Sequence, residues 1–297
     1  IVTSAVEHSA ILRPLESRER RGLRVTRVGV DADGALDREA LRDALGPESA
    51  LVTIMWANNE TGVIFPVDEI GEIAHRGGVP FHCDGVQAVG KLPLGLADLP
   101  LDMLSLSGHK LHGPRGIGAL YVSRRCRFHP QILGGGQEQG RRGGTENVAA
   151  IVGLGKAAEL AADALASERR RLAGLRDALE RGILEVAPDA VVNGAQSPRL
   201  PNTSNVAFPG CDAEGLLMLL DQRGVCASSG SACTTGSLDP SHVLTAMGAS
   251  SEHARSSLRF SLARHNQQHE IQPAVDAVAQ AVSKLAGFSR GGVKFAS

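Results

Sequence analysis

Residues 104–113 read Leu-Ser-Leu-Ser-Gly-His-Lys-Leu-His-Gly, a short apolar strand that runs directly into a polar turn. With Met103 before it, this apolar run predicts a buried strand. Lys110 stands in the turn between two histidines. A lysine at the end of a buried strand is partly desolvated, which favours the neutral amine that forms a Schiff base with an aldehyde. The alternative is an exposed loop lysine, because most lysines are exposed.

Composition excludes several classes of protein. The chain has 297 residues, a formal net charge of −1 and 42% hydrophobic residues, so no basic face for nucleic acid or membrane is expected. No apolar run approaches the ~18 residues of a membrane-spanning helix. The odd number of cysteines and the absence of a CxxC spacing argue against a disulfide framework and a zinc site. We therefore predict a cytoplasmic protein without a metal.

Apolar runs and amphipathic segments alternate through the first half of the chain. Three of the runs end in polar clusters, at residues 58–60, 84–87 and 107–110. The alternation predicts an α/β fold with a mostly parallel sheet and helices on both faces. Ligands of such sheets bind outside the carboxyl ends of the strands, which is where these clusters fall. The predicted strands are residues 1–4, 23–30, 51–56, 79–83, 103–106 and 119–122, and the clearest helices are 37–45 and 67–75.

The second half of the chain begins with two predicted helices, 148–166 and 169–186, with Ser167 as the N-cap of the second. We place a domain boundary at this junction. Residues 1–166 form the large cofactor-binding domain, and residues 167–297 form a smaller C-terminal α/β domain. A final helix is predicted over 271–285.

The polar clusters match the needs of pyridoxal phosphate (PLP). This cofactor requires a Schiff-base lysine, an acid beside its pyridine nitrogen, a ring neighbour and a phosphate cradle. Lys110 and Asp84 can supply the first two. His8 can stack on the ring, and Gln87 can bind its phenolic oxygen. Taken alone, Asp84 could equally be a helix N-cap, and His8 an ordinary turn residue.

Candidate phosphate ligands come from two places. Ser107 and His109 flank the lysine turn, and Thr145 precedes a predicted helix after the glycine-rich, basic segment 134–147. Helix N-termini bind phosphate, although basic glycine-rich loops are more often plain surface.

A second reactive group is Cys233. Its neighbours over residues 227–236 are glycines and hydroxyl residues, a composition typical of an exposed loop. An exposed cysteine is more often reactive than a buried one. The alternative is an incidental surface thiol, while the other four cysteines are interpreted as small core residues.

Together these motifs resemble the NifS/IscS-type cysteine desulfurases of the class V aminotransferase family. The resemblance covers essentially the whole chain. It rests on His8 and on the segments 58–62, 84–87, 107–110, 140–147 and 228–242.

The resemblance implies a PLP fold type I enzyme with a seven-stranded-type sheet that works as a homodimer. It implies conversion of L-cysteine to L-alanine, with the sulfur left as a persulfide on Cys233. A sulfur-acceptor or iron–sulfur scaffold protein would then take the sulfur for cluster or thio-cofactor assembly. No nucleic-acid or membrane partner is implied.

The resemblance also implies a role for each candidate residue. Lys110 holds PLP and shuttles the proton, and His8 stacks on the ring as a catalytic and cofactor-binding residue. Arg259 clamps the substrate carboxylate with a bidentate fork, assisted by Asn59 near the substrate and the ring oxygen. The remaining cofactor ligands implied by the family are Asp84, Gln87, Ser107, His109 and Thr145, the last reaching the phosphate of the partner subunit.

The family normally has an upstream phosphate-binding turn, and no residue of this sequence takes that role. We therefore expect an N-terminally incomplete chain, which leaves three other readings open. They are a selenocysteine lyase, a truncated and inactive dimerising or scaffold-binding module, and a thiol protease using Cys233 and His242. The protease leaves Lys110, Asp84 and Arg259 without a function.

Overall fold

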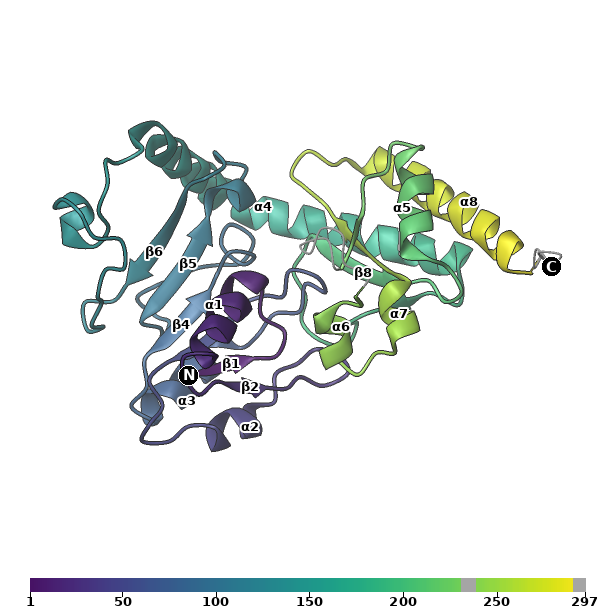
Figure 1. Ribbon diagram of the computed structural model, residues 1–297. Coiled ribbons are helices and arrows are strands. Elements are labelled where there is room, and N and C mark those ends of the chain that lie inside the picture. The colour runs from purple at the N-terminus through teal and green to yellow at the C-terminus, as the bar shows by residue number, and fades with distance from the viewer. Residues whose placement is uncertain (231–238, 291–297) are drawn as a thin grey trace.

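The computed structural model describes residues 1–230 and 239–290. They build two sheets, with the long helix α4 running between the two parts of the molecule (Figure 1). The first sheet contains β1 (Val2–Ser4), β2 (Thr26–Val28), β3 (Val52–Met55), β4 (Phe81–Asp84), β5 (Met103–Ser107) and β6 (Gly118–Val122). The second contains β7 (Val191–Val192), β8 (Thr203–Ala207), β9 (Ser228–Ser229) and β10 (Ser257–Ser261).

The first sheet confirms the predicted α/β class. Its order is β2-β1-β3-β4-β5-β6, and every neighbouring pair is parallel except β5 with β6. The described residues give this sheet six strands rather than the seven implied by the resemblance. The next strand along the chain, β7, pairs with β8 in the second sheet instead.

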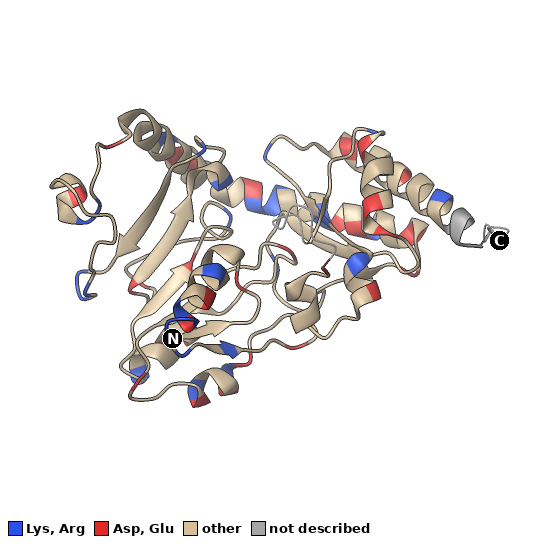
Figure 2. Ribbon diagram, viewed as in Figure 1, with Lys and Arg blue, Asp and Glu red and all other residues tan. Residues whose placement is uncertain are grey.

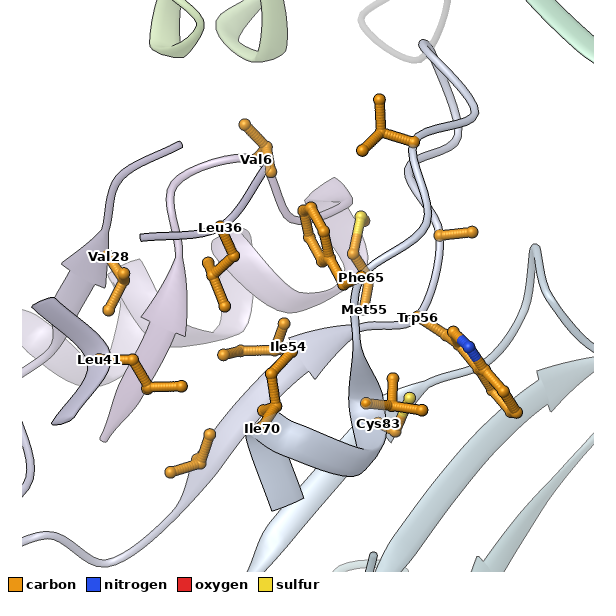
Figure 3. Close-up of a cluster of buried hydrophobic side chains, with 14 of the residues drawn as sticks. Val6, Val28, Leu36, Leu41, Ile54, Met55, Trp56, Phe65, Ile70 and Cys83 are labelled. Atoms are coloured by element: carbon orange, nitrogen blue, oxygen red, sulfur yellow. The ribbon is translucent and has the colours of Figure 1, made fainter. Parts of the chain in front are cut away.

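Helices α1 (Ser9–Glu19), α2 (Arg38–Asp43) and α3 (Val67–Arg76) connect the strands of the first sheet. Asp37 caps α2, since its side chain accepts hydrogen bonds from the amides of Glu39 and Ala40. Ile70 of α3 packs with Ile54 of β3 in a fully buried layer (Figure 3). Burial of such aliphatic side chains is the main force that holds α3 to the sheet.

The prediction of two helices around Ser167 is wrong. α4 runs without a break from Val148 to Val186. The segment around Ser167 contains no glycine or proline, and the Ser167 hydroxyl donates to the carbonyl of Ala164 inside the helix at 3.0 Å. A serine that bonds back within its own turn does not interrupt a helix, whereas its residue type alone suggested a cap.

A second core forms between α4, the second sheet and two further helices, α5 (Ala213–Asp221) and α8 (Ile271–Arg290). Leu175 and Ile183 of α4 and Leu216 of α5 are buried in it. The short helices α6 (His242–Ala246) and α7 (Ser251–Arg255) instead pack on the first core. The division at residues 166 and 167 stays a prediction, and the C-terminal part contributes to both cores.

Charged residues of both signs are interspersed along α1 and α4 (Figure 2). Among the described residues, no helix combines the length and the hydropathy needed to cross a bilayer.

Candidate functional site

Four neighbouring strand ends define the site. β1, β3, β4 and β5 are adjacent and parallel, so the turns that follow them lie along one edge of the sheet. The predicted polar clusters stand in these turns. The structure thus confirms that the clusters converge, and the pairwise contacts below show how.

His8 is the N-cap of α1. Its Nδ1 accepts the amide proton of Ala10 at 3.1 Å, so the proton of the neutral ring lies on Nε2. Burial lowers the pKa of His8, Asp84 acts in the opposite direction, and Lys110 lowers it further. These electrostatic couplings join three predicted site residues from three different turns.

Asp84 ends β4 and is almost completely buried. Its Oδ1 accepts the amide of Val86 at 3.0 Å, which tightens the turn after the strand. No helix begins there, so the alternative interpretation of Asp84 as a helix N-cap is wrong.

A polar bridge that the sequence analysis did not detect crosses the strands beneath this turn. His82 of β4 bonds Thr53 of β3 through Nδ1 and Ser105 of β5 through Nε2, each at 2.8 Å. Burial lowers the pKa of His82, which favours the neutral ring in this bridge. The only signal for this bridge in the sequence was the position of His82, inside the run 79–83 that is predicted to form a buried strand.

Lys110 lies on the short 3₁₀ helix η1 (Gly108–Leu111) and is exposed. The expectation that burial of the strand desolvates this lysine is wrong. Of the five residues of β5, only Leu104 is buried, so the strand before the lysine turn is itself only partly covered. On the same turn the Ser107 hydroxyl and His109 Nδ1 are 2.7 Å apart. Both groups are therefore held together, as two ligands of one anion need to be.

Lys91 is a further cation that the sequence analysis did not assign. Its ammonium donates to the carbonyl of Gln87 at 2.9 Å. Burial and the neighbouring Lys110 lower the pKa of Lys91 to about 8. The lysine therefore anchors the turn that carries Gln87 and adds a second amine near the first.

Arg259 reaches the site from the second sheet. Its Nη1 donates to the carbonyl of Asn59 at 2.9 Å, and its Nε is buried with no partner among the described residues. The contact joins two predicted substrate-binding residues that lie far apart in the sequence. An orphaned buried donor of this kind suits a carboxylate ligand.

The structure does not bring two of the predicted residues into this group. Thr145 is exposed in the loop before α4, two residues before Asn147, the N-cap of that helix. Cys233 lies outside the described residues. The residues on either side of its segment, Gly230 and Asp239, line a cavity of about 320 Å³ together with His8 and Asn59.

Glu7 is a buried carboxyl that no motif singled out. Its Oε1 accepts from the Ser4 hydroxyl at 2.6 Å and from the Met55 amide at 2.9 Å, while Oε2 is buried without a partner among the described residues. Its backbone carbonyl accepts from Nε2 of His242 at 2.9 Å. Glu7 thus ties the turn before His8 to β3 and α6.

Glu7→Gln should weaken the pH dependence of stability. Burial raises the pKa of Glu7 from 4.5 to about 8. The folded chain therefore holds a proton that the unfolded chain releases, and stability falls as pH rises from about 4.5 to 8, by at most ~1.4 kcal/mol per pH unit for this group. Glutamine stays neutral at every pH. The free energy of unfolding of the variant, measured by urea denaturation, should therefore fall less steeply between pH 5.5 and 7.5.

The exposed Glu72→Gln serves as the control and should keep the wild-type slope. Part of the slope should survive in Glu7→Gln, because burial also raises the pKa of Glu60, to about 7. Parallel stability profiles for wild type and Glu7→Gln would contradict the assignment.

Comparison with known proteins is consistent with this geometry. The family model of class-V aminotransferases matches residues 1–273. A cysteine desulfurase of Gluconacetobacter diazotrophicus is 53% identical over 286 residues, which are 96% of this chain and 72% of the relative. A solved NifS-like protein superposes with a TM-score of 0.87 at 34% identity, covering 95% of this chain and 74% of the other. A structure of SspA in complex with cysteine gives a TM-score of 0.74 at 38% identity, covering 88% and 72%.

Proposed function

Because this chain belongs to the class-V aminotransferases and, among them, to the cysteine desulfurases, we propose that its four converging strand ends form a PLP site that desulfurates L-cysteine. The family is PLP-dependent, and its substrate is cysteine. The observation that carries the proposal for this chain is the convergence of His8, Asp84 and Lys110, which are coupled electrostatically although they follow three different strands.

The groups present fit the proposed cofactor. The set contains a primary amine, a buried carboxylate, an imidazole with its proton on Nε2, and a hydroxyl paired with a second imidazole. These are the partners that an aldehyde, a pyridine nitrogen, an aromatic ring and a phosphate require. When bound, PLP supplies an aldehyde carbon and an electron sink.

Each side chain at the strand ends would then bind a different part of the cofactor. Asp84 would hold the proton of the pyridine nitrogen, and Gln87 would bind the ring oxygen. His8 would lie against the ring in its neutral form, in keeping with its lowered pKa. Ser107 and His109 would bind the phosphate. Lys110 would hold the cofactor covalently and move a proton to and from Cα of the substrate.

Arg259 and Asn59 would hold the substrate. The guanidinium would bind the carboxylate of L-cysteine, with its Nε, which has no partner among the described residues, as one of the donors. The sulfur would pass to Cys233. In this step the C–S bond of the substrate breaks and an S–S bond to the Cys233 sulfur forms. The thiol proton of Cys233 ends on the product L-alanine, so the atoms balance without an external oxidant.

A second copy of the chain and a sulfur acceptor complete the proposal. The exposed Thr145 would reach the phosphate of the partner subunit in a homodimer. A scaffold or acceptor protein would collect the persulfide sulfur for iron–sulfur or thio-cofactor assembly. Cys83, Cys126, Cys211 and Cys226 are free thiols, which suits the reducing cytoplasm proposed as the compartment. Cys83 and Cys211 are buried, but Cys126 is half-buried and Cys226 is exposed, so the interpretation of these two as core residues is wrong.

The other readings are less well supported. The curated relative is named for cysteine and not selenocysteine, and the retained Lys110, Asp84 and Arg259 argue against an inactive module. A thiol protease is disfavoured because Nε2 of His242 already contacts the carbonyl of Glu7.

The test is release of L-alanine and sulfide from L-cysteine by the full chain, with added PLP and a thiol reductant. We expect equal amounts of both products and a visible absorbance band that the apo chain lacks. Comparison with L-selenocysteine measures the preference between sulfur and selenium. A chain that binds PLP but releases no alanine from L-cysteine would overturn the proposal.

A further inference from the structure

Two residues of the second sheet hold successive carbonyls of the turn after β3. Nη1 of Arg259 donates to the carbonyl of Asn59 at 2.9 Å. Nδ2 of Asn205 donates to the next carbonyl, that of Glu60, at 3.2 Å. Arg259 and Asn205 lie directly opposite each other in the antiparallel pair of β10 and β8. The turn that carries Asn59 is therefore held from the second sheet at two adjacent points, one of which is the proposed substrate clamp.

A buried polar network fixes the orientation of the Asn205 amide. Asn205 is fully buried, and its Oδ1 accepts from Nδ2 of Asn193 at 2.7 Å. The backbone amide of Asn193 also donates to the Asn205 carbonyl at 2.8 Å. Oδ1 of Asn193 lies 2.7 Å from Nε2 of His253 on α7, and because an amide oxygen only accepts, that nitrogen carries the proton. With its oxygen bound by Asn193, Asn205 presents its amino group to Glu60.

The turn after β3 is also fixed from the side of the first sheet. Oδ1 of Asn58 accepts from the amides of Glu60 and Thr61 at 2.8 and 3.0 Å. Glu60 is only 3% exposed, so water does not replace a lost partner of its carbonyl. A buried carbonyl without a donor is costly, and the turn would move to recover one. Asn205 is thus the group that keeps this turn in place against the second sheet.

We propose that Asn205 is a positioning residue for substrate binding, because it holds Asn59 and Arg259 in the relative geometry that a bound carboxylate requires. The inference rests on the proposed function for its consequence in catalysis. Asn205 acts through the carbonyl of Glu60 and needs no contact of its own with the substrate. Misplacement of a binding group by about 1 Å can cost up to about 10²-fold in rate. The anchoring of the turn is itself measurable in the apo chain, without turnover.

Two substitutions interrupt the network at different points. Asn205→Ala removes the donor to Glu60. Asn193→Ala keeps that donor but removes the group that orients it, so its effects should have the same direction and be smaller. Asn202→Ala is the matched control, because Asn202 is also buried beside β8 but its Nδ2 donates to the carbonyl of Leu262 at 3.1 Å. We expect Asn202→Ala to behave as wild type in both readouts.

The first readout is amide hydrogen exchange of the full-length apo chain, measured by mass spectrometry on a peptide that covers residues 58–64. We expect exchange in this peptide to be at least about fivefold faster in Asn205→Ala than in wild type, because the turn that protects its amides loses an anchor. A peptide that covers residues 81–84 of β4 is the internal reference and should keep its rate. Faster exchange in both peptides would show that Asn205 supports the whole fold, and it would overturn the proposal.

The second readout compares two ligands that differ only at the carboxylate. L-Alanine carries the group that Arg259 and Asn59 are proposed to bind, whereas L-alaninamide has a neutral amide in its place. Titration of the visible band of the PLP-loaded chain gives the dissociation constant of each ligand. We expect Asn205→Ala to weaken binding of L-alanine about tenfold and of L-alaninamide less than about twofold, with the band of the unliganded chain unchanged.

Turnover of L-cysteine should show the same separation. In Asn205→Ala we expect KM to rise about tenfold while kcat changes less than about threefold. The double variant with Asn193→Ala should be no worse than Asn205→Ala alone, because both changes act on one contact. A merely structural role would lower cofactor occupancy and kcat together.

The outcomes separate the two proposals. Wild-type exchange over residues 58–64 in Asn205→Ala would overturn the positioning role, as would equal weakening of L-alanine and L-alaninamide. Faster exchange confined to that peptide, in a chain that makes no alanine, would leave the anchoring of the turn standing and reject the proposed function. If Asn205→Ala does not fold, Asn193→Ala decides the same two comparisons with smaller shifts.

Discussion

Lys110→Ala should eliminate the visible absorbance of the PLP-loaded chain and lower alanine formation by at least about 10³-fold. Lys110 is the one lysine on the turn after β5, and its charge is felt by both His8 and Lys91. In the proposed function its removal would take away both the covalent attachment of the cofactor and the group that moves the substrate proton, and a positioned acid–base group alone contributes about 10²–10⁴-fold.

Two controls make this result specific. Lys156→Ala removes an exposed lysine that pairs with Glu159 on α4 and should change neither spectrum nor rate. Lys91→Ala tests whether the neighbouring amine can replace Lys110, and we expect it to retain the visible band. A Lys110→Ala variant that keeps both the band and the rate would show that another lysine holds the cofactor.

Cys233→Ala should abolish persulfide formation while preserving the visible band. The thiol is the proposed acceptor of the substrate sulfur, so its loss leaves the C–S bond without its nucleophile. We expect alanine formation to fall by about 10²-fold or more, in the range of effects of removing a nucleophile. The contrast with Lys110→Ala is diagnostic, because one variant loses the cofactor spectrum and the other keeps it.

Cys226→Ala is the matched control for this experiment. Cys226 is exposed and lies in the same part of the chain, yet no role is proposed for it. Mass spectrometry of the intact chain after a single turnover should show one added sulfur atom in wild type and in Cys226→Ala. An added sulfur in Cys233→Ala would move the acceptor role to another cysteine.

The sequence was most informative about which segments carry the candidate site residues. Buried runs that end in Asn58–Glu60, Asp84–Gln87 and Ser107–Lys110 were recognisable because strand and helix periods differ and polar residues end an apolar run abruptly. Parallel pairing then places these ends along one edge. The roles of the individual residues stay predictions, and Lys110→Ala and Cys233→Ala test two of them.

Local sequence patterns were less informative about the continuity of helices and the exposure of side chains. Ser167 has the residue type of a cap, but its hydroxyl bonds back to the carbonyl of Ala164 and α4 continues as one helix. Lys110 follows an apolar run, but it is exposed, and only Leu104 of the strand before it is buried. Residue type alone records neither the back-bonded serine nor the exposed lysine.

Sequence alone determined the fold class, the three polar strand ends and the family to which they belong, because these features depend on residue type, spacing and period along the chain. Only the tertiary structure decided that Arg259 meets Asn59, that His82 bridges three strands, and that Asn205 donates to the carbonyl of Glu60. Such contacts join residues from different strands and from both sheets. They exist only once hydrophobic burial has brought the two cores together, and no local pattern records them.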